Sequence, residues 1–449
     1  MYVPTSSYAE MGEWALPAGE GVVFHRVLRD AVARHEPDAR WLRGGFWRNF
    51  QVKYREINDL HKQMLRTSAK VARMPAGADK AAAQDHLHRG QSNDCYWHGL
   101  FGGIYIPHMR MATLEHLIAA EDAADTALGS QSAAGLADLD MDGRDEAFLE
   151  APGQVVTVKP AEGAGIASWD LRAARHGVAS VMRRRPEAYH EALRAHDAKA
   201  AALAAEPGEG DGGATSIHDI VMTKEAHLSE YLHYDDHERR SALVRFLDPT
   251  ATPEQYAVAS EREVADFRDG EFAVDRLEQS LLSLSRAGNV LGQPVELTKT
   301  IRLSGGRMDP ELTVELEVRH RGTQPVDARL GVELGVNLLG GGGNPDAWYE
   351  VDGARSRHDG AGTAEAMDAI RYGNDWAGVA ITARAEPAAD VWWSPIETVS
   401  NSESGFERVY QGSALLLSWL VRLEPGSVHR WSVCQSAAVA RDKAAAERA

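Results

Sequence analysis

The sequence predicts an α+β protein with more than one domain, in which an N-terminal helical bundle precedes a large antiparallel β-sandwich. Three observations support this prediction. Apolar residues recur at the helical period within the first 128 residues, the pattern changes to short alternating runs near Gly129, and strand-like segments separated by glycine-rich turns recur from Thr250 onward. A chain of 449 residues is long enough for two or three domains.

Three segments carry the helical pattern. Apolar residues at three- and four-residue spacing predict helices over residues 21–35, 56–73 and 105–125. Pro37 closes the first segment, and Pro107 lies near the first turn of the third, where proline is tolerated. Together these segments predict a small helical bundle.

The remainder of the chain predicts strands with few helices, which is typical of an antiparallel β-sandwich. An excursion interrupts it at about residues 183–248, with a helix predicted from the start of RRRPEAYHEALRAH and a glycine-rich loop after it. The predicted layout is therefore a helical domain over 21–128 and a β-sandwich domain over 129–449.

The composition limits the classes of function. The net charge of −18 argues against binding to nucleic acid, because contacts to a phosphate backbone need clustered lysine and arginine. Cys95 and Cys434 are too few for a disulfide framework, and a reducing cytoplasm is the expected setting. The N-terminus has no signal-peptide pattern and the apolar runs are far too short to cross a bilayer, so no membrane association is expected.

The segment richest in polar and aromatic residues is QSNDCYWHGLFGGIY, residues 91–105. Asn93 and Asp94 carry side chains of the kind that chelate vicinal hydroxyls, and Trp97 offers an apolar face to the C–H side of a pyranose ring. Glycines in the same segment allow a ligand to approach the backbone. The alternative is a helix and loop with a core tryptophan and a satisfied core histidine at His98.

A second segment, residues 41–62, places Trp47, Asn49 and Lys53 among basic and aromatic side chains. This combination occurs in sites for single-stranded nucleic acid, but the acidic total argues against that interpretation. An ordinary helix pair with basic side chains reaching to solvent is the alternative.

A third segment, residues 8–17, holds Glu10 and Glu13 beside Trp14. Two neighbouring carboxylates suggest the catalytic pair of a glycosidase. Two glutamates three residues apart on a helix face are more often simply solvated, so we assign neither of them a catalytic role.

Asp138, Asp140 and Asp142, followed by glycine, resemble the opening of a calcium-binding loop. Leu149 stands where such a loop needs its glutamate, so a charged turn between strands is the alternative to a calcium site. No other cofactor is expected, because the chain has no P-loop and no dinucleotide fingerprint. The glycine-rich run 339–345 is predicted to be a loop.

Two remaining segments have undecided chemistry. One is a cluster of histidines with carboxylates nearby: His218, His227, His233 and His237. Their spacing is not that of a helical zinc site, so we predict a surface segment. Residues 392–412 are rich in serine, asparagine and glutamate, and predict either a sugar-contacting face or a hydrogen-bonded turn.

At QSNDCYWHGLFGGIYIPHMR the sequence resembles the last conserved region of the 4-α-glucanotransferases and α-amylases of glycoside hydrolase family 57. It resembles that family also in YVPTSSYAEMGEWALP, in LRGGFWRNFQVKY followed by His61 and Lys62, in SIHD at 216–219 and in SPIETVSNSESGF. These stretches follow the family's order, so the resemblance covers nearly the whole chain.

The resemblance implies that residues 1–20 leave a catalytic barrel, that a helical domain completes the substrate cleft, and that a β-sandwich similar to the galactose-mutarotase type follows. The implied ligand is an α-1,4-glucan or maltooligosaccharide. Positions that match the family's motifs, and that would face this glucan, are Glu13, Trp14, Trp47, Asn49, Lys53, Asn93, Asp94, Trp97 and His98.

The same resemblance places the family's nucleophilic glutamate and acid/base aspartate on the barrel, which aligns before Met1. We therefore assign no catalytic residue within these 449 residues, and expect activity only with a separate catalytic-barrel chain. The alternatives are a non-catalytic α-glucan-binding or scaffolding module and a non-functional remnant. The shared motifs leave transferase and hydrolase activity both open. Without the barrel, apolar residues of the segment 1–20 would be exposed, which favours self-association, including a homo-oligomer.

Overall fold

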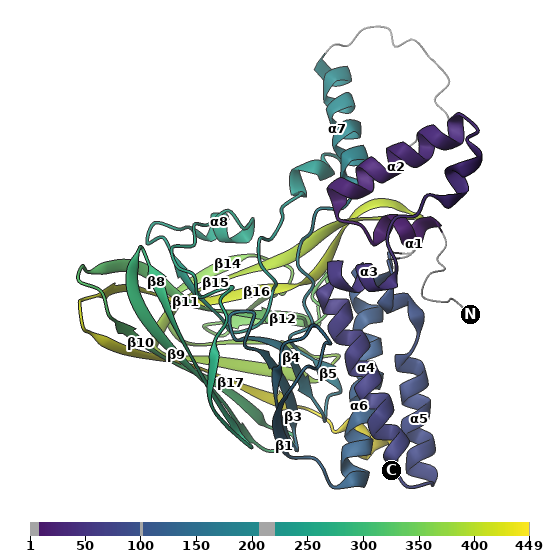
Figure 1. The fold of residues 1–449 in the computed structure, drawn as a ribbon. Helices are drawn as coiled ribbons and strands as arrows, with labels where there is room; N and C mark the ends of the chain where they lie inside the picture. The colour runs from purple at the N-terminus through teal and green to yellow at the C-terminus, as the bar shows by residue number, and fades with distance from the viewer. Residues whose placement is uncertain (1–8, 99–101, 206–220, 449) are drawn as a thin grey trace.

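The computed structural model describes residues 9–98, 102–205 and 221–448. Helices come first and strands follow (Figure 1), so the predicted order of a helical region and a large antiparallel β structure is confirmed. The helices and 3-10 turns of the first part are α1 (Ala9–Trp14), α2 (Ala18–Ala33), η1 (Pro37–Trp41), α3 (Trp47–Lys53), α4 (Arg55–Arg73), α5 (Ala78–Gly90), η2 (Asn93–Tyr96), η3 (Gly103–Tyr105) and α6 (Pro107–Leu128).

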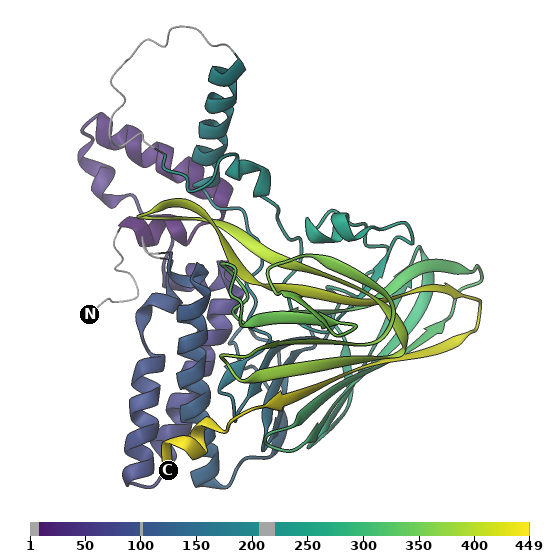
Figure 2. The ribbon, with the colours of Figure 1, turned by 180° about the vertical axis from the view of Figure 1, so that it is seen from behind.

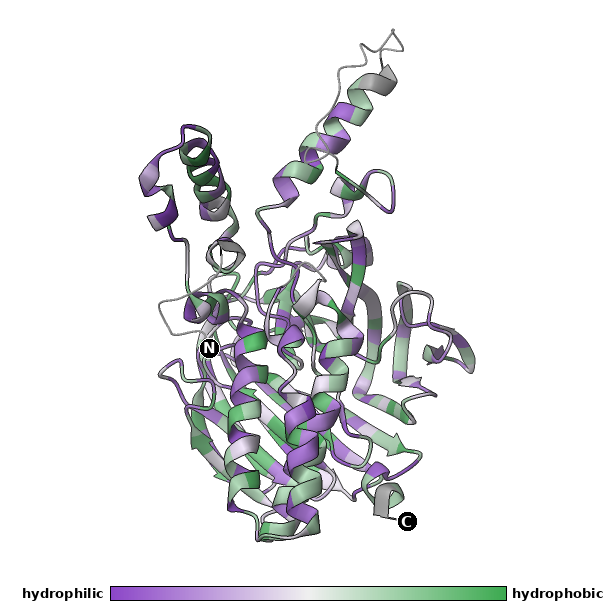
Figure 3. Ribbon diagram, turned by 90° about the vertical axis from the view of Figure 1, so that its right-hand side faces the viewer, coloured by the Kyte–Doolittle hydropathy of each residue, from purple (hydrophilic) through white to green (hydrophobic). Residues whose placement is uncertain are grey.

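Helices α4, α5 and α6 lie side by side as a three-helix bundle (Figures 1 and 2). The buried face of α4 includes Ile57, Leu60 and Val71, at the spacing that places residues on one side of a helix. Both hydrophilic and hydrophobic residues line these helices, as Figure 3 shows. Pro107 opens α6, and the helix ends at Gly129, whose φ of +66° is in the left-handed region that favours glycine.

Two features of the helical part differ from the prediction. Helix α5 was not predicted, because its alanine-rich sequence has only a short buried stripe at Ala83, Leu87 and Gly90. Helix α2 forms close to its predicted place but does not join the bundle, and projects from the end of it together with η1 (Figures 1 and 3). Its residues Val23 and Val27 are therefore 48% and 46% exposed.

A five-stranded antiparallel sheet packs against the bundle (Figure 1). Each strand pairs with the next along the chain: β1 (Ala133–Ala137), β2 (Glu146–Ala151), β3 (Gln154–Lys159), β4 (Gly165–Leu171) and β5 (His176–Gly177). Buried polar contacts join the two layers. The Gln63 amide donates to Asp170 over 2.9 Å, and the Arg172 guanidinium lies 2.8 Å from the Asp125 carboxylate.

A twelve-stranded sheet forms the other layer. Its strands are β6 (Leu243–Leu247), β7 (Ala273–Glu278), β8 (Leu281–Val290), β9 (Gln293–Gly305), β10 (Pro310–His320), β11 (Val326–Val336), β12 (Ala347–Val351), β13 (Ala354–Arg357), β14 (Gly362–Asn374), β15 (Val379–Ser402), β16 (Gly405–Leu423) and β17 (Val428–Val439). The pairings between these strands are antiparallel. The first part of β15 pairs with β17 and its second part with β16, so one long strand joins two parts of the sheet.

One apolar core fills the space between the two sheets. It includes Val156 and Trp169 from the smaller sheet and Ile301 and Leu316 from the larger one, all 2% exposed or less. Burial on this scale is the main favourable contribution to folding, at roughly 25 cal/mol per Å² of apolar surface.

The predicted excursion contains α7 (His190–Ala205) and η5 (Leu228–Tyr231). Helix α8 (Pro253–Ala257) follows it, and α9 (Lys443–Arg448) lies near the C-terminus. The predicted helix forms as α7, but it begins at His190 and not at residue 183, because Arg184 and Arg185 lie buried outside any helix and pair with carboxylates. The prediction of a surface histidine segment was wrong at His237, which is 3% exposed. His218 lies outside the described residues.

Within the part of the chain that the structure describes, every helix is too short or too polar to span a bilayer.

A buried lysine joins the larger sheet to the segments that precede β4 and β6. Lys299 on β9 is fully buried, and its ammonium donates to the carbonyl oxygens of Ala164 and Ala242, over 2.6 Å in each case. Burial lowers the pKa of Lys299 to about 7, because the charged form loses its hydration.

We expect Lys299 to make the free energy of unfolding increase as the pH rises from about 7 to about 10. The unfolded chain binds a proton at Lys299 up to about pH 10.4, whereas the folded chain releases it near pH 7, so stability rises with pH through that window. Between pH 7 and pH 10 in urea unfolding, the free energy of unfolding of the wild type should rise relative to that of Lys299→Met, by about 3.5 kcal/mol. An identical pH dependence in the two proteins would contradict this assignment.

Candidate functional site

Three tryptophans from separate segments meet at the end of the bundle, and we call them the tryptophan cluster: Trp14 at the end of α1, Trp47 at the start of α3, and Trp97 after η2. The ring centres of Trp14 and Trp97 are 6.2 Å apart, and those of Trp47 and Trp97 are 6.4 Å apart. Each ring is half-buried, so each presents part of its surface to solvent. Half-buried indoles at this spacing suit a ligand with apolar faces and polar edges.

Glycines bring the first two tryptophans together. The Gly45 amide donates to the Gly12 carbonyl over 2.8 Å, which joins α1 to the segment before α3. A Cβ atom on Gly44 would lie 2.1 Å from the same carbonyl oxygen, so a side chain there would push α1 away. The glycine pair of LRGGFW therefore sets the approach of Trp14 to Trp47.

His98 packs against the tryptophan cluster on its buried side. It is fully buried, its ring centre lies 3.3 Å from that of Trp14, and its Nε2 atom is 3.2 Å from the Tyr189 hydroxyl. Burial lowers the pKa of His98 to about 3, so the imidazole is neutral at physiological pH. It therefore acts as a fixed polar support and has no charge to offer a ligand.

A buried carboxylate that the sequence does not predict, Glu187, lies on the protein side of these rings. Glu187 accepts hydrogen bonds from Tyr54 and Tyr105 at 2.7 Å each, and from the Lys53 ammonium at 2.8 Å. Burial opposes the charge, but Lys53 and the hydrogen bonds outweigh it, and the pKa of Glu187 falls to about 2. Glu187 is thus ionised and ties α3, α4 and η3 together.

One signal in the sequence could have pointed to Glu187. Pro186 follows three arginines and disfavours helix at Arg185, which predicts a non-helical segment leading to Glu187. Nothing in the local sequence indicates which side chains Glu187 meets, because its partners come from more than 80 residues earlier.

The remaining candidates from the bundle have structural partners. Asn49 accepts from the Phe46 amide over 3.0 Å and caps α3. Lys53 is held by Glu187 and by the Trp14 carbonyl, at 3.2 Å. These two side chains support the tryptophan cluster from the protein side.

Three polar candidates lie near the surface. Asn93 and Asp94 are exposed on η2, three to four residues before Trp97. Glu13, next to Trp14, is 3.3 Å from the His25 imidazole. Asn93 and Asp94 are therefore open to a ligand beside the cluster. The side chain of Glu10 lies outside the described part of the chain.

The aspartates of the predicted calcium loop form a hydrogen-bonded turn. Asp138 accepts from the amides of Asp142 and Gly143, at 3.0 Å each. Asp138 and Asp140 do lie close to Glu146, within 4.8 Å for one oxygen of each, so three carboxylates converge. Burial raises the pKa of Glu146 to about 7.

These carboxylates fit a calcium ion poorly. The Lys159 ammonium already lies 2.5 Å from Asp140, so one of the three carboxylates has a cation of the protein as its partner. Asp142 is not one of the converging group, and its carboxylate accepts from the Arg144 amide. Calcium binding here remains a prediction.

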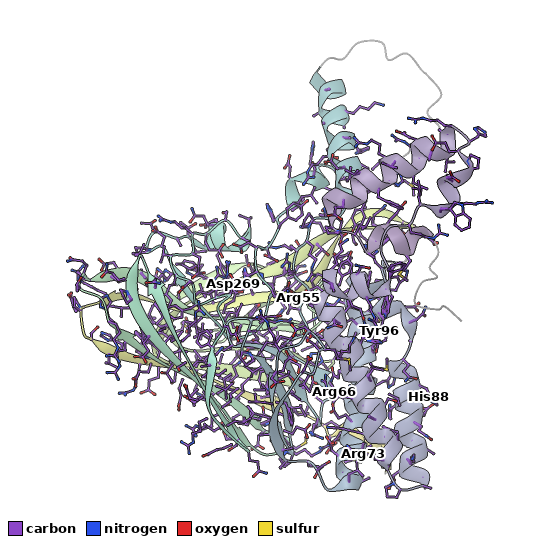
Figure 4. All side chains as sticks on the ribbon, in the orientation of Figure 1. Arg55, Arg66, Arg73, His88, Tyr96 and Asp269 are labelled. Carbon is purple, nitrogen blue, oxygen red and sulfur yellow. The ribbon has the colours of Figure 1, made fainter. Side chains whose placement is uncertain are left out.

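A second polar region lies where the helices meet the strands. Arg55 and Asp269, both labelled in Figure 4, line a groove of about 410 Å³ there. Its charges pair with each other: Arg55 lies 2.9 Å from Glu162, and Arg268 lies 2.6 Å from Asp269. Self-paired charges of this kind favour a structural junction over an anion site.

Family models match most of the chain. Residues 138–433 match the model described as alpha-amylase/4-alpha-glucanotransferase, C-terminal, and residues 45–124 match the alpha-amylase/4-alpha-glucanotransferase middle domain. The tryptophan cluster draws Trp47 and Trp97 from the middle-domain match.

Curated relatives are longer than this chain. Alpha-amylase 1 of Dictyoglomus thermophilum is 32% identical over 447 residues, which cover 96% of this chain and 60% of that protein. A 4-alpha-glucanotransferase of Thermococcus kodakarensis is 32% identical over 92% of this chain and 56% of its own length. The chain thus spans a little over half the length of these relatives.

Among solved structures, the crystal structure of 4-alpha-glucanotransferase from Thermococcus litoralis matches with a TM-score of 0.74 and 25% identity, over 98% of this chain and 58% of that chain. A galactose mutarotase related enzyme from Lactobacillus acidophilus also matches, over 66% of this chain. Its TM-score of 0.39 at 11% identity is too low to carry an argument about function.

We expect Glu187→Gln to destabilise the protein, because the change leaves the buried Lys53 ammonium without its counter-charge. The depressed pKa of Glu187 corresponds to about 3 kcal/mol of stability, present above the unfolded pKa near 4.3 and lost as pH falls towards 2. Thermal unfolding at pH 7 should show a lower midpoint, and the difference from wild type should shrink as the pH is lowered to 3. The exposed Glu20→Gln on α2 is the matched control and should behave as wild type.

Proposed function

The chain belongs to the alpha-amylase/4-alpha-glucanotransferase family, and on that premise we propose that it is the glucan-binding portion of an α-1,4-glucan-processing enzyme. The observation that carries this proposal is the tryptophan cluster with the exposed Asn93 and Asp94 beside it. The relatives' names support the ligand class, and the exposure of these side chains supports their proposed role in contacting it.

The cluster suits a pyranose chain for chemical reasons. An indole face packs against the C–H side of a sugar ring, and its edge remains polar. Carboxylate and amide side chains such as Asp94 and Asn93 bind pairs of hydroxyl groups at the rim. The neutral His98 and the ionised Glu187 fix the rings from below, so the surface is preorganised before a ligand arrives.

The carboxylates of this site do not suit glycosidic bond cleavage on their own. A retaining pair needs two carboxyl groups about 5–5.5 Å apart, one of them with a raised pKa to act as the acid. Glu187 is the opposite case, because burial among donors keeps it ionised and both its oxygens are engaged. Asp94 is exposed and Glu13 is paired with His25.

We therefore propose that the catalytic carboxylates come from a catalytic barrel outside these residues. In a double displacement, one such carboxylate forms a bond to the glucosyl carbon while the acid protonates the departing oxygen, and water or a second sugar then takes the glucosyl unit. Transferase and hydrolase outcomes differ only in that acceptor.

Exposed apolar side chains on the N-terminal helices would be covered by a docked partner. Val27 on α2 is 46% exposed and Val52 on α3 is 75% exposed. Exposed apolar side chains of this size mark interaction surfaces. We propose the catalytic barrel as the occupant, with a second copy of this chain as the alternative. Of the apolar residues expected to be exposed near the N-terminus, Tyr2, Val3 and Tyr8 lie outside the described residues.

The first measurement is activity of the purified 449-residue chain. Incubation with maltoheptaose should give no ladder of shorter and longer maltooligosaccharides by chromatography, because the site lacks a suitable carboxylate pair. A ladder that survives repurification and is lost in Asp94→Ala would overturn the proposed dependence on an outside barrel.

The second measurement is binding. Trp97→Ala should weaken maltoheptaose binding by roughly tenfold or more in isothermal titration calorimetry, since it removes the central ring of the cluster. Trp41→Ala, an exposed tryptophan outside the cluster, is the matched control and should bind as wild type does. Equal affinities of wild type and Trp97→Ala would count against the cluster. Glucan binding with no gain of activity on adding a catalytic barrel would favour a non-catalytic binding or scaffolding module.

A further inference from the structure

A groove of about 600 Å³ lies between the start of α6, the glycine-rich loop before β12 and the β15–β16 hairpin. It joins segments whose chemistry the sequence left undecided, because the loop 339–345 and the hairpin segment 392–412 both line it. His108 on α6 is exposed at its edge. The volume falls in the range of small-molecule sites, roughly 300–1,000 Å³.

Trp376 is the most exposed large apolar side chain that lines this groove, at 72%. It sits in the turn between β14 and β15, and its neighbours hold that turn in place. The Asp375 amide donates to the Asp346 carbonyl over 2.8 Å, and the Asp375 carboxylate accepts from the Trp348 indole, also over 2.8 Å. A rigid turn thus presents a bare indole to the groove, a surface that gains free energy when it is covered.

The glycine-rich loop forms one wall. A Cβ atom on Gly341 would lie 2.4 Å from the Tyr410 Cβ atom, so the loop can pass over Tyr410 only without a side chain. Gly342 has a φ of +67°, and a Cβ atom placed on it would meet nothing within 4 Å, so its backbone is open. The Asn344 side chain donates to the Leu339 carbonyl over 2.9 Å and closes the loop. A fixed backbone wall of this kind offers polar peptide groups to a ligand.

The charges at the rim are compensated. Arg408 lies 2.8 Å from Glu225 and 3.1 Å from Glu397, and Glu407 pairs with Lys224. The groove therefore has no unpaired charge, among the residues described, that would select an anion or a cation. Its paired groups still offer donors and acceptors to hydroxyls at the rim. An exposed indole, open backbone and neutralised polar rim match a neutral, polyhydroxylated ligand.

We propose that this groove is a second binding site for α-glucan, separate from the tryptophan cluster, with Trp376 as the surface on which a sugar ring stacks. The ligand class rests on the proposed function, whereas the location and the stacking residue rest on the groove itself. Two sites on one chain would hold a long glucan at two points and raise its affinity by making the second contact intramolecular.

The test is a titration of the full 449-residue chain with maltoheptaose by isothermal titration calorimetry, comparing wild type with three variants. Trp376→Ala should lose one binding event or weaken it by roughly tenfold, while Trp97→Ala affects the other event. Trp41→Ala is the matched control, because Trp41 is similarly exposed, at 66%, and lies outside both sites. In the wild type, maltoheptaose should protect Trp376 from oxidation by N-bromosuccinimide, read by peptide mass spectrometry, and should leave Trp41 unprotected.

The outcomes separate the two proposals. Wild-type binding in Trp376→Ala together with loss in Trp97→Ala would overturn the groove and leave the proposed function standing. Loss in Trp376→Ala alone would support the groove and overturn the role of the tryptophan cluster. No binding to the wild type, or no change in either variant, would overturn both.

Discussion

The buried Glu187 carboxylate is the contact on which the site depends. It lies in the segment that leads into α7, yet its partners Lys53, Tyr54 and Tyr105 belong to α3, the start of α4 and η3. An ionised carboxylate removed from water is costly unless donors surround it, and three donors do so here. Because Lys53 also holds the Trp14 carbonyl, the same network fixes the exit of α1 and the tryptophan above it.

Buried polar contacts also join the helical bundle to the smaller sheet. Lys70 on α4 contacts Glu121 on α6 and Glu150 on β2, at 2.7 and 3.0 Å. Asp170 on β4 is buried opposite Gln63, and burial raises its pKa to about 7. Such buried polar contacts fix the position of one layer on the other, since sliding either layer would leave a buried polar group without its partner. The bundle therefore carries the tryptophan cluster at a defined place relative to the β domain.

The buried side of the cluster is also connected directly to the larger sheet. Arg110 near the start of α6 donates to the Ile104 carbonyl and to the Gln411 side chain on β16, and Gln411 donates back to the Tyr105 carbonyl over 2.9 Å. These bonds bring the hairpin of β15 and β16 against η3. The groove with Trp376 and the tryptophan cluster thus border the same short stretch of chain, which is consistent with one extended ligand contacting both.

The sequence by itself determined the order of helices and antiparallel strands, two of the bundle helices and the family. These depend on local patterns such as the apolar period of α4 and the QSNDCYWHGLFGGIYIPHMR motif, which need no knowledge of partners. It also indicated Trp14, Trp47, Trp97 and His98 as candidate site residues, and the fold places them in contact. Only the tertiary structure decided that α2 leaves the bundle, that Lys53 and Asn49 have structural partners, that Glu187 is buried among donors and that Trp376 is exposed beside a groove. Those outcomes depend on contacts between residues far apart in the chain, and a local pattern carries no record of which distant side chain will supply a buried charge with its partner.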